Sequence, residues 1–204
     1  MHKAHSILAT VVLLAGVIGG CARTGRTPRP TPAERSTQQA VELAARAEQA
    51  MRREQWSESV ALNREALAAN PALGGAWTNL GVGLMNLHEN LEAAQCFQRA
   101  AELLPTDPKP FESLALLHMN MGWHEHALQL YDMSLERSPY WLPSIRGSVL
   151  AAKNLNRSTD DGLDRIKRGL LVEKDPKWRR LFETEQVRVS QDLAESRRRE
   201  GRAN

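Results

Sequence analysis

Three histidines and a glutamate between positions 118 and 126 are the residues of this chain whose types could do chemistry. They are His118, His124, Glu125 and His126, and His88 lies upstream of them. Imidazole and carboxylate groups bind transition metals when three or four of them converge. On a helix, however, His124 and His126 stand two positions apart and point in different directions. We therefore expect no metal site, and a histidine-based metal-dependent protein or enzyme is the alternative hypothesis.

Other signatures of catalysis are missing from the sequence. It contains no P-loop, dinucleotide fingerprint, GxSxG elbow, HExxH motif or paired-cysteine metal site. The adjacent carboxylates Asp160 and Asp161 precede Gly162, where Asp is simply favourable in a turn. We therefore predict that the protein is not an enzyme, has no catalytic residues and needs no cofactor.

A period of 34 residues organises the chain instead. It relates three prolines and the small residues five positions before them: Pro71, Pro105 and Pro139, with Ala66, Ala100 and Ser134. A fixed period of this length indicates an array of small supersecondary units that bury their apolar faces against one another. Helical arrays of this kind provide binding surfaces, so we expect a protein that holds a partner.

The second unit has the clearest pattern of helical spacing. Its apolar and small residues fall on two helices that a proline ends: Trp77, Leu80, Gly81, Leu84, Ala93, Phe97, Ala100 and Pro105. They match the pattern W-x2-L-G-x2-Y…A-x3-F…P, with Leu84 in the tyrosine place, so the sequence resembles the tetratricopeptide repeat (TPR) family. The resemblance implies an all-α, right-handed α-solenoid of about three to four helical hairpins, whose concave face cradles peptides or helices of partner proteins.

The predicted array covers residues 32–175, with repeats near 40–73, 74–107 and 108–141 and a degenerate repeat over 142–175. Thr31 and Glu34 have the spacing of a capping box, so the first helix should begin at Pro32. Residues 176–204 combine an amphipathic helix with a basic tail. We expect this helix to cap the array, because the end of an array needs a polar outer surface. A position in the groove or a contact with another chain is the alternative.

The first 20 residues have the plan of a secretory signal, with Lys3 before an apolar run that ends near Ile18. The sequence Ile18-Gly19-Gly20-Cys21 resembles the lipobox of bacterial lipoproteins, which implies that Cys21 carries lipid. Residues 21–31, rich in Pro and Arg, should act as a semi-rigid tether. The expectation is a lipid-anchored protein of a bacterial cell envelope that faces the periplasm. An ordinary cleaved leader and an uncleaved anchor helix are the alternatives.

A second series recurs on the first helix of each hairpin. Glu48, Val82, Leu116 and Leu150 are each followed three residues later by Met51, Met85, Met119 and Lys153. The resemblance implies that these positions face the concave groove as an apolar strip, rimmed by Glu48 and Lys153. Methionine at helical spacing also occurs in cores, and that is the competing interpretation. Asn79 and Lys109 match two places at which some family members clamp a peptide's terminal carboxylate, but Ala44, Glu48 and Ser113 do not.

The sequence thus predicts a membrane-tethered, non-enzymatic scaffold that binds a protein partner in its groove, in envelope, pilus or secretion assembly. The formal net charge is only +3, and we expect no nucleic-acid partner. A basic module that binds membranes or polymers through the final arginines Arg197, Arg198, Arg199 and Arg202 is a further alternative. The sequence does not predict the oligomeric state.

Overall fold

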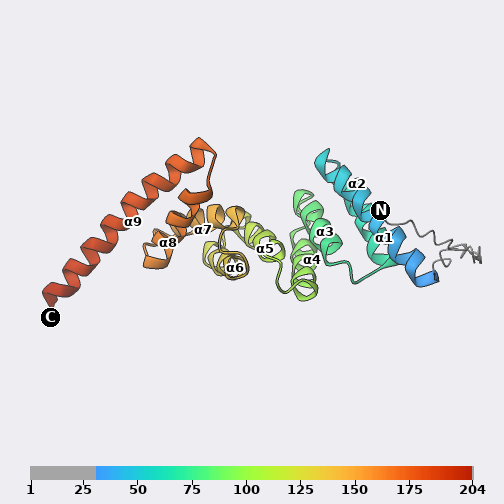
Figure 1. The fold of residues 1–204 in the computed structure, drawn as a ribbon, viewed down its shortest axis with the longest axis horizontal. Coiled ribbons are helices and arrows are strands. Elements are labelled where there is room, and N and C mark those ends of the chain that lie inside the picture. Colours follow the sequence, from blue (N-terminus) through green and yellow to red (C-terminus); the bar gives the residue numbers. More distant parts are fainter. Residues whose placement is uncertain (1–30, 204) are drawn as a thin grey trace, which may run out of the picture. The chain divides into compact units, whose positions relative to one another are not determined.

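The structure, a computed structural model, describes residues 31–203. The predicted leader (residues 1–20), the lipidation site Cys21 and the tether up to residue 30 lie outside the described residues. The described range holds nine helices and no strand (Figure 1). The helices are α1 (Pro32–Arg52), α2 (Trp56–Ala69), α3 (Gly74–Asn86), α4 (Asn90–Leu103), α5 (Lys109–Asn120), α6 (His124–Arg137), α7 (Leu142–Asn154), α8 (Asp160–Val172) and α9 (Pro176–Ala203).

The helices stack in the order of the chain. The pairs α1–α2, α3–α4, α5–α6 and α7–α8 form four hairpins, and the second helix of each packs on the first helix of the next. First helices also touch in sequence, α1 with α3, α3 with α5, and α5 with α7, while no helix of residues 31–203 touches a hairpin beyond its neighbour. Contacts limited to neighbours are the mark of a solenoid.

Helix α9 stands where a fifth hairpin would place its first helix. It packs against α8 and, more lightly, against α7, at the end of the row in Figure 1. Phe182 and Val189 of α9 are buried in one cluster with Ile145, Val149 and Ile166 of the fourth hairpin. The helix therefore covers the last hairpin, as the capping hypothesis requires. Within residues 31–203, no helix combines the length and the apolar character needed to cross a bilayer.

The start of the array follows from local hydrogen bonding. The Thr31 hydroxyl oxygen accepts a hydrogen bond from the Glu34 amide at 3.2 Å, and the Glu34 carboxylate accepts one from the Thr31 amide at 2.6 Å. Pro32 takes the first helical position, where its missing N–H costs nothing. The predicted capping box is therefore present, and it satisfies two amides that the helix itself cannot pair.

The 34-residue period also appears in the backbone. Glu54, His88, Gly122 and Asn156 have φ angles of 58°, 65°, 77° and 49°, each in the turn inside a hairpin. The helices α2, α4 and α6 begin two residues after these positions, whereas α8 begins only at Asp160. The fourth repeat therefore keeps the period through its first helix and loses it in the turn that follows Asn156.

Glycines set the closeness of the helices. A methyl group built on Gly81 of α3 would lie 2.5 Å from the buried Phe97 ring of α4. One built on Gly169 of α8 would lie 2.6 Å from the Phe182 ring of α9. A phenyl ring therefore sits directly on a bare backbone both inside a hairpin and under the cap, and no larger residue fits without displacing it.

Replacing Gly81 by Ala should destabilise the protein. The added methyl must push against Phe97, which has no free space, and we expect a loss of about 1–2 kcal/mol in urea denaturation, net of the better helix propensity of Ala. Gly75→Ala is the matched control, because nothing lies within 4 Å of a methyl at that site in the same helix. An equal loss of unfolding free energy in both variants would contradict the close-approach argument.

Candidate partner-binding groove

The ten predicted groove residues all lie on the first helices of the four hairpins. They are Glu48 and Met51 on α1; Asn79, Val82 and Met85 on α3; Lys109, Leu116 and Met119 on α5; and Leu150 and Lys153 on α7. None of the ten is fully buried. Leu116 exposes 39% of its surface. The first helices thus present these side chains at the surface instead of enclosing them.

The middle of this face is apolar. We call Val82, Met85, Leu116, Met119 and Leu150 the groove strip. Val82 and Met85 rest partly buried on the core of the second hairpin, and Met119 rests on the cluster around Tyr131. The Asn120 amide lies 3.9 Å from the Met85 sulfur and bridges α5 to α3. One side of the strip therefore packs on the core, and the other side is exposed to solvent.

A hollow of about 520 Å³ lies at the end of the groove nearest α1. Two predicted residues, Glu48 and Asn79, line it together with Val41 and Ala44 and the start of α3. Glu48 forms an exposed ion pair with Arg52 at 3.0 Å. The exposed pair adds little to stability, so Glu48 stays available to a ligand.

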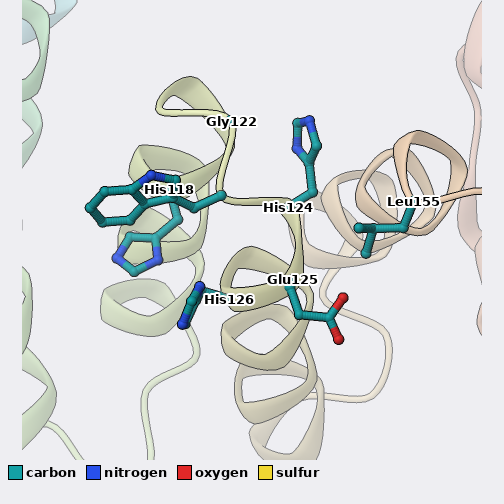
Figure 2. Close-up of a pocket in the computed structure, with 7 residues that line it drawn as sticks. His118, Gly122, His124, Glu125, His126 and Leu155 are labelled. Carbon is teal, nitrogen blue, oxygen red and sulfur yellow. The ribbon is translucent and has the colours of Figure 1, made fainter.

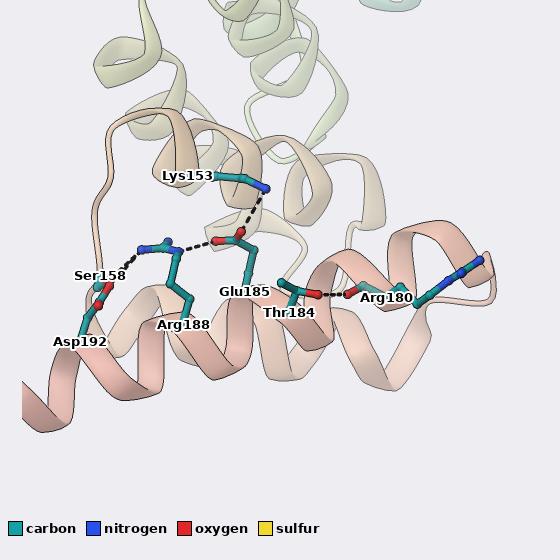
Figure 3. Close-up of polar contacts among 7 residues, drawn as sticks. All are labelled: Lys153, Ser158, Arg180, Thr184, Glu185, Arg188 and Asp192. Carbon is teal, nitrogen blue, oxygen red and sulfur yellow. Dashed lines mark hydrogen bonds and ion pairs between the residues drawn. The ribbon is translucent and has the colours of Figure 1, made fainter.

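At the other end of the groove, Lys153 contacts the capping helix. Its ammonium lies 3.1 Å from the carboxylate of Glu185 on α9, which also pairs with Arg188 at 2.9 Å (Figure 3). Arg188 in turn reaches Asp192 at 3.0 Å and the Ser158 hydroxyl at 3.1 Å. The Glu185 side chain is 4% exposed, so α9 uses a buried carboxylate to hold Lys153. This predicted rim cation is therefore committed to the cap.

Sequence reasoning missed Glu112, which shares a helical face of α5 with Leu116 and Met119 at spacings of four and seven. Its carboxyl group is partly buried, and burial raises its pKa to about 7. Within residues 31–203 no ion pair and no side-chain hydrogen bond reaches that carboxyl. The signal in the sequence was the 34-residue spacing of Ala44, Thr78, Glu112 and Arg146, a third series beside the two we analysed.

Two of the three histidines labelled in Figure 2, His118 and His126, pack with the Trp123 ring. The rings of His118 and Trp123 meet edge to face with centroids 5.2 Å apart, and His126 lies 6.0 Å from His118. Burial, and secondarily His126, lowers the pKa of His118. His124 points away from this pair, and Glu125 is bound to Arg157 at 2.7 Å. Among residues 31–203, no three His, Cys, Asp or Glu side chains are placed to hold a metal ion.

Cys96 is the other reactive residue type within the described range. It is buried on α4 at 2% exposure beside the core of the second hairpin. Burial raises the pKa of its thiol to about 11. A thiol that stays protonated at neutral pH is a poor nucleophile, so Cys96 acts as a core residue.

No protein-family model matches the chain. Over 121 residues it is 27% identical to the peroxisomal targeting signal receptor of Kluyveromyces lactis, covering 59% of this chain and 21% of that receptor. The receptor of the same name from Eremothecium gossypii is 27% identical over 119 residues, or 58% of this chain and 20% of the receptor. The chain thus spans about a fifth of the length of these curated relatives.

Solved structures share the fold. The Sgt2 TPR domain from Aspergillus fumigatus superposes with a TM-score of 0.55 at 21% identity, covering 62% of this chain and 82% of that one. The first TPR domain of Spaghetti (RPAP3), bound to an HSP90 peptide, gives 0.56 at 17% identity over 59% and 95%. YrrB, a TPR protein with an unusual peptide-binding site, gives 0.57 at 18% identity over 71% and 74%.

These similarities define the class of fold. The described residues form a right-handed α-solenoid of the tetratricopeptide type, with four hairpins and a closing helix. The predicted fold class is confirmed. Two of the three structures are described by a bound peptide or a peptide-binding site, and at these identities all three establish the fold alone.

Replacing Glu112 by Gln should stabilise the protein at high pH and leave it unchanged in acid. The raised pKa means that the folded state resists ionisation of Glu112, so its contribution to stability falls as pH rises from the ordinary value of 4.5 to about 7. Gln removes that cost, and we expect a gain of roughly 1–3 kcal/mol near pH 8 and none near pH 4. Urea denaturation at both pH values measures it, and an equal gain at both would refute the buried carboxylate.

Proposed function

We propose that this chain is a non-enzymatic scaffold, tethered to a membrane through lipid on Cys21, that binds a segment of a protein partner along the groove strip. The observation that carries the proposal is an apolar surface that the fold leaves uncovered. Leu116 is 39% exposed, and Val82, Met85, Met119 and Leu150 are partly exposed beside it. Contiguous apolar residues at a surface mark sites of interaction.

The chemistry of the strip favours an apolar guest. Methionine is flexible and polarisable, so Met85 and Met119 can adapt to side chains of different shape. Leucine and valine beside them offer no hydrogen bonds, so affinity would come from burial of apolar surface at about 25 cal/mol per Å². The partner would present either the apolar face of a helix or an extended apolar segment. Peptide binding by the RPAP3 domain and YrrB supports a peptide segment as the partner.

The tether and the location form the second part of the proposal. The residues Ile18-Gly19-Gly20-Cys21 support a lipid anchor at the end of a cleaved leader. Each buried methylene contributes about 0.8 kcal/mol, so several acyl chains together hold a protein firmly on a bilayer. The scaffold would then act in a bacterial cell envelope, facing the periplasm, in the assembly of an envelope structure such as a pilus or secretion system.

Site-specific photo-crosslinking tests the groove. A photoreactive amino acid at Leu116 should crosslink the full-length chain to a partner in native membranes, and the same residue at Leu91 is the control, since Leu91 is 78% exposed on α4. Adding Met85→Glu and Met119→Glu should reduce the Leu116 product at least about tenfold, because a charge cannot enter the apolar contact.

The two glutamates should leave the melting temperature nearly unchanged, because both methionines are partly exposed. A large drop in melting temperature would show that the strip belongs to the core. Equal crosslinking with and without the glutamates would show that the partner binds elsewhere.

Replacing Cys21 by Ser tests the anchor. Without a thiol the chain cannot be acylated, so we expect it to move from the membrane pellet to the soluble fraction after cell lysis. Cys96→Ser is the matched control, because that thiol is buried in the array and should not affect fractionation. Unchanged sedimentation of the Cys21 variant with membranes would refute lipidation as the anchor.

A further inference from the structure

Glu112 has an equivalent position on the first helix of each of the other three hairpins. The equivalent residues are Ala44, Thr78 and Arg146. The Thr78 hydroxyl donates to the Gly74 carbonyl at 3.2 Å, and Arg146 makes two hydrogen bonds of 2.7 Å to Glu173. The polar groups of Thr78 and Arg146 are therefore already paired within the chain. The Glu112 carboxyl has no ion pair and no side-chain hydrogen bond within the described part of the chain, and the titratable group beside it is the buried Tyr131 phenol, whose pKa it helps to raise.

Cations on α5, α6 and α7 do not pair with Glu112. Lys109 lies one turn earlier on α5 and is exposed, yet it forms no ion pair with Glu112. Arg137 of α6 stacks over Phe111, 3.7 Å from the ring centroid, and donates to the Pro105 carbonyl at 2.7 Å. Arg146 on α7 is held by Glu173 at 2.7 Å. No positive charge of residues 31–203 therefore compensates the carboxyl group.

Glu112 shares a face of α5 with Leu116, the most exposed residue of the groove strip. On α5 it is followed at helical spacing by Leu116 and Met119, so the three side chains share one face. A carboxylate that is partly withdrawn from water and unpaired reduces stability. Conflicts of this kind between a residue and its fold concentrate at functional sites.

We propose that Glu112 binds a Lys or Arg side chain of the partner segment, whose neighbouring apolar residues cover Leu116 and Met119. A charge-assisted hydrogen bond to a carboxylate is about twice as strong as a neutral one. It gains further when the complex excludes water, since the free protein has already withdrawn the carboxyl from solvent. The inference rests on the proposed function, because it specifies the partner chemistry of the same groove.

Selection from a random-peptide display library tests it without knowledge of the natural partner. The full-length chain in detergent, its Glu112→Gln variant and its Met85→Glu/Met119→Glu variant are each used as bait. Peptides selected by the native chain should carry Lys or Arg at one fixed position between apolar residues. A selected peptide should bind Glu112→Gln about tenfold more weakly, whereas the control Glu65→Gln, on the exposed surface of α2, should bind as the native chain does.

The outcomes separate the two claims. If no peptide distinguishes the native chain from the double methionine variant, the groove does not bind peptides and the proposed function fails. If peptides require Met85 and Met119 but show no basic residue, or bind Glu112→Gln equally well, the groove stands and the role of Glu112 is overturned. Melting curves confirm that each variant is folded.

Discussion

Close approach of an aromatic ring to a bare backbone is the constraint on which this array depends. Phe97 fills the space above Gly81 inside the second hairpin, and Phe182 fills the space above Gly169 beneath the cap. Tyr131 does the same against Gly147, where α6 of the third hairpin packs on α7 of the fourth. These contacts set how closely successive helices lie, and thereby how the first helices align to form one face. The groove is a product of this packing, because its residues lie on the first helices that these contacts align.

The ion pairs of the array differ in burial according to where they lie. Buried or partly buried ion pairs lie around the fourth hairpin: Glu185 of α9 holds Lys153, and Glu173, which ends α8, holds Arg146 of α7. Ion pairs elsewhere are mostly exposed and contribute little. The groove face itself is largely apolar and contains one carboxyl group, Glu112, with no pairing inside the described range. Ion pairs therefore fix the side chains at the Lys153 end of the groove, whereas the groove strip is an exposed apolar surface.

The fold could be predicted from the sequence, because the 34-residue period and the pattern from Trp77 to Pro105 depend on local packing that recurs in every unit. The first hairpin departs from this pattern, since Asn63 stands where Phe97 stands in the second; Asn63 is fully buried, and its side-chain amide donates to the Ser59 carbonyl at 3.0 Å. Placement of the groove residues on first helices also followed from the period. The ion pair of Lys153 could not be predicted, because Glu185 lies outside the repeats and its register depends on how α9 docks. Glu112 was missed because isolation of a charge depends on where Arg137 and Arg146 point.

The turns inside the hairpins leave room for change. Three of the four left-handed positions, Glu54, His88 and Asn156, carry side chains where Gly122 carries none. A side chain in this conformation costs on the order of 1 kcal/mol. Since these residues lie in the turns between the two helices of a hairpin, glycines at these positions would remove that cost and raise the thermal stability of the chain. None of these three residues belongs to the predicted groove set, so the stability of the fold can change at these turns without a change in the residues that contact a partner.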